Sequence, residues 1–222
     1  MNKVLVLAVH PDDETLGCGG TILRHKMNGD KVYWLIATDM KKKKGFSRKK
    51  ILQREREIKI ATKKYGFDGI YKLGIPTIEV ERWPINKVIK KISEILQQVK
   101  PNILYLPFMG DTHSDHRIIS EAAWSSAKKF RCPFIKKILA MEIISETEFA
   151  PSLKEIAFIP NYFVDITDYL DKKIDIIKIF KTEINQHPFP RSLKNIKALA
   201  IFRGATAGYK YAESFMILKE AW

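Results

Sequence analysis

Apolar residues along the chain form two kinds of stretch, short continuous runs and longer segments with helical spacing. The runs are rich in branched residues and resemble strands buried on both faces of a sheet, whereas the longer segments place their apolar residues on one side of a helix. The predicted strands cover 3–9, 31–37, 69–73, 103–106, 138–144 and 162–165. The predicted helices cover 15–28, 48–65, 86–99, 115–127, 167–181 and 192–202. This alternation predicts a Rossmann-like three-layer α/β fold with a mainly parallel sheet.

The rest of the C-terminal region has a weaker pattern. Residues 203–208 are small and predict a flexible segment, and 211–218 fits either a closing strand or a short helix. No stretch is long enough to act as a linker between domains, and 222 residues suit one full-sized core. We therefore expect a single domain over 1–222.

The chain is strongly basic, with 39 lysines and arginines against 25 acids and a formal net charge of +14. Its lysines are scattered along the whole length, whereas a nucleic-acid-binding protein concentrates them in a patch or stripe. We therefore expect no nucleic-acid partner. A basic field draws anionic substrates toward a cleft, so the charge suggests a phosphate-bearing substrate.

Membrane and disulfide signals are both missing from the sequence. No run of 18 uncharged apolar residues occurs, and the chain begins at once with a strand instead of a leader, so we expect a cytoplasmic protein with no membrane span. Only Cys18 and Cys132 are present, far apart in sequence, and we expect both to be reduced thiols.

A compact polar group, His10–Glu14, follows the first predicted strand. In open α/β sheets, ligands bind outside the carboxyl ends of the strands, and Pro11 stiffens the turn on both sides of itself. A zinc-like ion takes nitrogen and oxygen donors at about 2.0–2.2 Å, and a catalytic site keeps one position for water. His10 and Asp13 could share one such ion, with Asp12 near enough to take a proton from the bound water.

A second polar group follows the predicted strand at 103–106. It contains two of the five histidines, His113 and His116, together with Asp111 and Asp115. The first group and this one both lie after strands of the same predicted sheet. Together they supply the histidines and the carboxylate of a three-ligand site, which favours metal binding.

A structural role accounts for each of these acids taken singly. Asp12, Asp13 and Glu14 could cap a helix N-terminus and complement its dipole, and Asp115 could cap the helix that runs to Ala127. On this reading the chain is a metal-independent Rossmann-like module that binds a nucleotide or a nucleic acid, with no role for His116.

The two groups, AVHPDDETLGCGGTI from Ala8 and HSDH at 113–116, match the motifs of a known family. The chain resembles the PIG-L/LmbE family of zinc-dependent N-acetyl-sugar deacetylases. REREIKIATKKYG, which begins with Arg54, resembles the intervening Arg-x-x-Glu helix, and RGATAGYKYAESF resembles the closing segment. From spacing alone, Arg54 and Glu57 predict a modest ion pair on the surface of that helix.

The resemblance implies an LmbE-like fold and hydrolysis of the acetyl amide of an N-acetylglucosaminyl-type sugar or its conjugate. Carried over by position, it makes His10, Asp13 and His116 the ligands of Zn²⁺ and Asp12 the general base. Another divalent ion such as Fe²⁺ stays open. So does self-association into a homo-oligomer.

The resemblance implies further roles around this centre. His113 would stabilise the oxyanion or act as an acid, Asp115 would orient its neighbours, and Arg54 would contact the sugar. Some members carry an oxyanion-assisting tyrosine shortly before the second motif, where this chain has Asp111. The alternative of a Ser-His-Asp hydrolase that uses Ser114 lacks a GxSxG elbow.

No motif in the sequence identifies the sugar. We expect three loops, at 40–47, 77–84 and 186–192, to determine it.

Overall fold

The seven strands of the computed structural model form one sheet in the order β3-β2-β1-β4-β5-β7-β6. The structure describes residues 1–41 and 45–221. The first five strands of the chain run parallel to one another, and β7 runs antiparallel between β5 and β6. The strands are β1 (Lys3–Ala8), β2 (Lys31–Asp39), β3 (Gly69–Pro76), β4 (Ile103–Pro107), β5 (Lys137–Met141), β6 (Tyr162–Asp165) and β7 (Ala212–Glu220).

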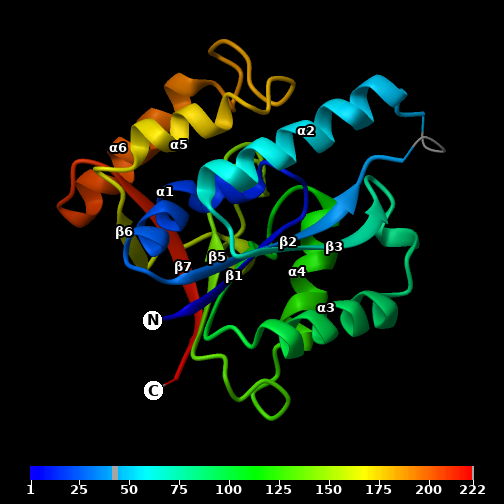
Figure 1. The fold of residues 1–222 in the computed structure, drawn as a ribbon. Coiled ribbons are helices and arrows are strands. Elements are labelled where there is room, and N and C mark those ends of the chain that lie inside the picture. Colours follow the sequence, from blue (N-terminus) through cyan, green and yellow to red (C-terminus); the bar gives the residue numbers. More distant parts are fainter. Residues whose placement is uncertain (42–44, 222) are drawn as a thin grey trace.

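Helices cover both faces of this sheet, as the sequence predicts (Figure 1). One face carries α1 (Asp13–Met27), α2 (Arg48–Tyr65), α5 (Leu170–Ile177) and α6 (Leu193–Ala207), and the other carries α3 (Ile85–Val99) and α4 (Ser114–Ser126). Short 3₁₀ turns lie at Val80–Arg82 and Lys154–Ile156. Among the described residues, every helix is too short or too polar to cross a lipid bilayer.

The first strand is buried on both faces, which explains its continuous apolar sequence. Val4, Val6 and Ala8 belong to the core under α1 and α2, whereas Leu5 and Leu7 belong to the core under α3 and α4. Because side chains alternate along a strand, both faces of β1 need apolar residues to fill the two cores. The prediction of a strand buried on both faces is confirmed.

The C-terminal elements differ most from the prediction. The flexible segment expected at 203–208 is wrong, because α6 continues to Ala207 and ends at Gly208, whose φ of 77° suits a left-handed helix cap. The predicted helix at 167–181 is shorter, since regular α5 covers only Leu170–Ile177. Of the two options for 211–218, the strand is confirmed as β7.

A kink at Cys18 divides α1 and is held by a buried ion pair. Cys18 has φ −148° and ψ 27°, so the helical hydrogen bonds are interrupted there. The carboxylate of Glu213 accepts hydrogen bonds from the backbone N–H groups of Gly20 and Thr21 at 2.9 and 2.8 Å. Lys173 donates from Nζ to the Leu16 carbonyl at 2.9 Å and to Glu213 at 2.7 Å. The pair therefore satisfies backbone groups that the kink leaves without helical partners.

We expect Glu213→Ala to lower the free energy of unfolding by about 3–5 kcal/mol, because it leaves a buried ammonium and two buried N–H groups without partners. Urea denaturation measures the change. The matched control is Glu220→Ala on the same strand, whose partner Lys137 lies 2.8 Å away in a more exposed pair, and it should cost less than about 1 kcal/mol. Equal losses in the two variants would contradict the role given to Glu213.

Candidate functional site

The two polar groups meet at the point where the order of the sheet changes direction. β1 pairs with β2 on one side and with β4 on the other. The chain runs outward from β1 to β2 and β3, and the next connection crosses back to β4 on the opposite side of β1. His10–Glu14 follows β1, and Asp111–His116 follows β4. Because β1 and β4 are parallel neighbours, their carboxyl ends lie together and form the crevice in which α/β folds bind ligands.

The first turn is built around the carboxylate of Asp13. Its Oδ2 accepts hydrogen bonds from the backbone N–H groups of Val9 and His10, at 3.0 and 2.8 Å. Asp12 has φ 145°, an unfavourable backbone conformation for a residue with a side chain, and it makes no side-chain cap to α1. Glu14 accepts the Asp12 N–H at 3.0 Å and thereby helps to hold this strained turn. The helix-cap interpretation is therefore wrong for Asp12. Asp13 instead accepts hydrogen bonds from the two residues that directly follow β1.

The second turn uses a histidine as the helix cap. His113 is the N-cap of α4, and its Nδ1 accepts the backbone N–H of Asp115 at 3.1 Å. The expectation that Asp115 is the cap is therefore wrong, because Asp115 lies within the first turn and accepts the Ile78 N–H at 2.9 Å. His116 is fully buried in the first helical turn of α4, and its ring points toward Asp13 in the turn after β1.

Three donor atoms converge between the two turns. His116 Nε2 lies 3.3 Å from both His10 Nδ1 and Asp13 Oδ2, and the last two atoms are 3.8 Å apart. Donors bound to one tetrahedral ion at about 2.0–2.1 Å would be roughly 3.3–3.4 Å apart. The residues present therefore fit a divalent transition-metal ion, and the structure brings together the three ligands that the sequence predicts.

Each histidine of this group also has a carboxylate near its other ring nitrogen. Asp111 Oδ2 lies 2.9 Å from His116 Nδ1, and Asp115 Oδ2 lies 3.5 Å from His10 Nε2, a buried atom without a hydrogen bond from the described residues. Carboxylates in this position fix the tautomer and ring orientation of metal-binding histidines. Asp111 is therefore placed to orient the ring of His116.

A second possible ligand group shares one residue with the first. His10, His113 and Asp115 also offer donor atoms close enough to hold an ion. In this group, however, Nδ1 of His113 is occupied by a backbone N–H, which leaves only its Nε2 to bind an ion. In the first group each histidine has a carboxylate near its other ring nitrogen, which favours that group.

The charges around the centre favour a cation between the donors. Burial alone would lower the pKa of His116, but the neighbouring Asp13 and Asp111 outweigh it and raise that pKa to about 10. Burial opposes ionisation of Asp13, yet His116 and His10 hold its pKa well below the usual value. Burial, reinforced by the charge on Asp13, raises the pKa of Asp12 well above its usual range. The acid beside the donors is thus more basic than an ordinary aspartate.

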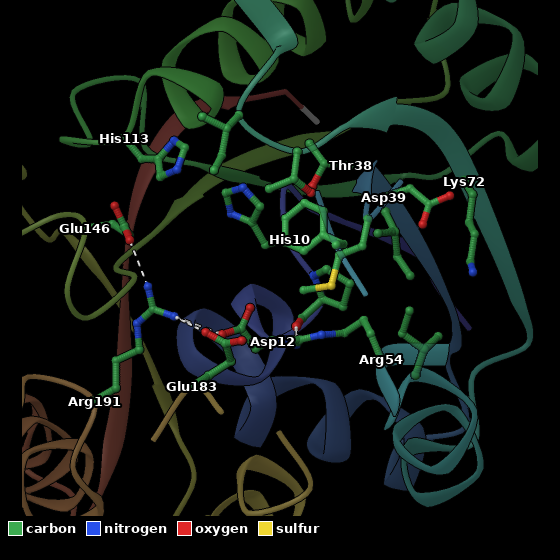
Figure 2. Close-up of a pocket in the computed structure, with 17 residues that line it drawn as sticks. His10, Asp12, Thr38, Asp39, Arg54, Lys72, His113, Glu146, Glu183 and Arg191 are labelled. Carbon is green, nitrogen blue, oxygen red and sulfur yellow. Dashed lines mark hydrogen bonds and ion pairs between the residues drawn. The ribbon is translucent and has the colours of Figure 1, made fainter. Parts of the chain in front are cut away.

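A cavity of about 260 Å³ opens beside the donor group, with His10, Asp12 and His113 on its wall (Figure 2). Burial and the charges of the other two histidines lower the pKa of His113 to about 4, which keeps its ring neutral at pH 7. Since Nδ1 accepts a hydrogen bond, the proton of the neutral ring is on Nε2. The remaining lining residues are mixed apolar and polar: Pro11, Ile36, Thr38, Asp39, Met40, Phe46, Arg54, Ile58, Lys72, Thr77, Ile78, Glu146, Glu183 and Arg191.

The predicted loop at 40–47 contributes Met40 and Phe46 to this wall. Residues 42–44 of that loop lie outside the described residues.

Arg54 lies on the cavity wall but is held by the protein itself. Its Nη1 donates to the Pro11 carbonyl at 2.7 Å, its Nη2 bonds to Glu183, and its Nε lies 3.3 Å from Glu57. The predicted pair with Glu57 therefore exists, but its surface position is wrong, because both side chains are buried. Arg54 therefore braces the first turn through the Pro11 carbonyl.

Sequence reasoning missed a second arginine and two acids. Arg191 bonds to Asp12, Glu146 and Glu183, and all four side chains line the cavity (Figure 2). Glu183 and Arg191 lie in the connection between α5 and α6, whereas Glu146 follows β5, and the three share no motif, so only the fold brings them to Asp12. The one local signal is the proline-bounded loop that contains Arg191.

The chain is similar to a known protein family and to a curated deacetylase. The family model described as PIG-L, GlcNAc-PI de-N-acetylase, matches residues 5–127, which are more than half of the chain and include both motifs. A diacetylchitobiose deacetylase of Thermococcus kodakarensis is 26% identical over 226 aligned positions, covering 96% of this chain and 82% of that protein.

Solved structures with the same fold have more than one activity. An N,N'-diacetylchitobiose deacetylase from Pyrococcus horikoshii, in complex with an inhibitor, has a TM-score of 0.78 at 23% identity, covering 98% of this chain and 84% of that one. A 4-carboxy-2-hydroxymuconate hydratase from Pseudomonas putida has a TM-score of 0.75 at 17% identity, covering 100% and 98%. The fold alone therefore does not decide the reaction.

We expect His116→Ala to abolish stoichiometric binding of added Zn²⁺, whereas His113→Ala should bind about one equivalent, because His116 Nε2 belongs to the converging donors and His113 caps a helix. Metal analysis after gel filtration measures both. If His113→Ala loses the ion and His116→Ala keeps it, the second ligand group is the metal site.

Proposed function

The chain belongs to the PIG-L family, and from this premise we propose that it is a metal-dependent hydrolase of N-acetylated amino sugars. The reaction would remove the acetyl group from an N-acetylglucosamine-type sugar or its conjugate and release acetate and a free amine. The named activity of the Thermococcus kodakarensis relative supports this choice over hydration.

One observation carries the proposal, namely that three donor atoms suited to a divalent ion converge at the cavity wall beside Asp12. His10, Asp13 and His116 would hold Zn²⁺, with Fe²⁺ as the alternative. A bound ion of this kind supplies Lewis acidity, which makes water a nucleophile near pH 7 and polarises the acetyl carbonyl.

Asp12 is the residue placed to move the proton. In the proposed reaction its carboxylate takes a proton from the attacking water as the new C–O bond forms, and it then delivers that proton to the sugar nitrogen as the C–N bond breaks. Its raised pKa suits both transfers, because the group must accept and release a proton near neutral pH. This order balances the reaction: water adds to the acetyl group, and the amine leaves neutral.

His113 would stabilise the negative charge on the acetyl oxygen. Its neutral ring carries the N–H on Nε2, so it acts as a hydrogen-bond donor at pH 7 and not as an acid. Because the cap to α4 fixes the ring before substrate arrives, the donor needs no rearrangement during the reaction. His113 would fill the role that a tyrosine has in some relatives.

The cavity suits a sugar ring more than a nucleotide. Phe46, Met40 and Ile78 offer apolar surface to the ring, and carboxylates such as Asp39 offer acceptors for hydroxyl groups. Both arginines of the wall are paired with acids, so a phosphate on the substrate would have to reach Lys72 at the edge.

The competing functions explain less of this geometry. A nucleotide-binding module needs no histidine between two carboxylates, yet His116 is held by Asp13 and Asp111. A Ser114 hydrolase needs a histidine hydrogen-bonded to its nucleophile, and among the described residues no histidine bonds to the Ser114 hydroxyl.

We expect Asp12→Asn to lower kcat for acetate release by about 10²–10⁴-fold while the metal content stays unchanged, because the amide cannot accept the proton. The assay measures acetate from a panel of N-acetylated sugars with added Zn²⁺. Asp39→Asn is the matched control, since this second cavity acid pairs with Lys41 and should alter KM more than kcat. Full activity of Asp12→Asn, or no acetate from any sugar with the metal-loaded parent, would contradict the proposed function.

A further inference from the structure

The Arg191 guanidinium donates four hydrogen bonds to three segments of the chain. Nη1 donates to Asp12 Oδ2 at 3.1 Å and to Glu183 Oε2 at 3.3 Å. Nη2 donates to Glu146 Oε1 at 3.0 Å, and Nε donates to Ser145 Oγ at 2.5 Å. A planar guanidinium with four partners has little freedom to rotate.

The local sequence fixes the direction from which this side chain enters. Arg191 stands between Pro190, whose ring fixes its own φ, and Ser192, the N-cap of α6. Ser192 Oγ accepts the Asn195 N–H at 3.2 Å, and Asn195 in turn donates to the Pro190 carbonyl. The backbone on both sides of Arg191 is therefore held by the start of the helix.

Glu183 links the two arginines that brace the first turn. One of its carboxylate oxygens bonds to Arg54, which donates to the Pro11 carbonyl, and the other bonds to Arg191, which donates to Asp12. The network thus holds two successive residues of the strained turn, one through its backbone and one through its side chain.

The positive charge of Arg191 is shared between Asp12 and two further acids. Three carboxylates surround the one guanidinium, those of Asp12, Glu146 and Glu183. An arginine with Asp12 as its only partner would make that acid a weaker base. With two further acids beside it, Arg191 can fix the position of Asp12 at a smaller cost in basicity.

We propose that Arg191 is a positioning residue for Asp12. Arg191 holds Oδ2 of the Asp12 carboxylate and leaves its Oδ1 as the oxygen that takes the proton. In the described part of the chain, no residue donates a hydrogen bond to Oδ1. This inference rests on the proposed function, in which Asp12 is the general base. It assigns a role to a residue outside both sequence motifs.

The test compares Arg191→Met with Arg203→Met in the metal-loaded protein. Arg203 is a matched control, because it also forms a partly buried ion pair, with Glu142, but does not line the cavity. We expect Arg191→Met to lower kcat for acetate release about 10²-fold with KM within about threefold, since a small displacement of the base has an effect of that size. Arg203→Met should keep the parent kcat.

Two further measurements separate positioning from a general structural effect. The visible spectrum of the Co²⁺-substituted protein should be the same in Arg191→Met and the parent, because the ligands are untouched. Guanidinium ion at millimolar concentration should restore part of the activity of Arg191→Ala and none of Asp12→Ala. If Arg191→Met fails to fold, Arg191→Lys replaces it, and its kcat should still fall at least about tenfold because an ammonium cannot span the same partners.

The possible outcomes are distinct. Parent-like kcat in Arg191→Met, an equal loss in Arg203→Met, or an altered cobalt spectrum would overturn the role of Arg191. If Asp12→Asn is inactive while Arg191→Met is fully active, only this inference fails. An inactive parent would reject the proposed function itself.

Discussion

The parallel pairing of β1 with β4 is the constraint on which the site depends. Val4 lies opposite Ile103 and Val6 opposite Tyr105, so the two strands run in register and end at the same edge of the sheet. Residues about one hundred positions apart in sequence then share one small volume, in which His10 and His116 face each other at 3.3 Å. Two imidazole nitrogens and a carboxylate oxygen this close are best satisfied by a cation between them.

Much of the remaining structure holds these turns in place. Asp13 is fixed by two backbone N–H groups, Asp12 by Arg191, and the Pro11 carbonyl by Arg54. The helix that starts at Asp13 is kinked at Cys18, where the Lys173–Glu213 pair replaces missing helical hydrogen bonds. These buried charges therefore serve geometry at the site and in its supporting helix, and each of them has a partner.

The sequence predicted what local patterns determine. Continuous apolar runs predicted the parallel core, and the two motifs at its strand ends predicted six of the residues that the fold brings together. The hydrogen-bond partners of these residues could not be predicted, because nothing in the HSDH motif indicates that His113 caps the helix or that Asp111 holds His116. Arg191 and its acids were missed for a different reason. Glu183 and Arg191 lie between α5 and α6, Glu146 follows β5 and Asp12 follows β1, so their proximity depends on the antiparallel addition of β7 and the placement of α6. The same small residues that suggested flexibility at 203–208 extend a helix once Gly204 lies against the backbone of Tyr209.

X-ray absorption spectroscopy at the zinc edge, on protein loaded with one equivalent of Zn²⁺, tests the central claim most directly. The account predicts two imidazole nitrogens and one carboxylate oxygen at about 2.0–2.2 Å, with a light-atom ligand from solvent in the fourth position. It also predicts loss of one imidazole signal in His116→Ala. A first shell that contains sulfur, or one whose imidazole count is unchanged by that substitution, would contradict the convergence of the two turns on one ion.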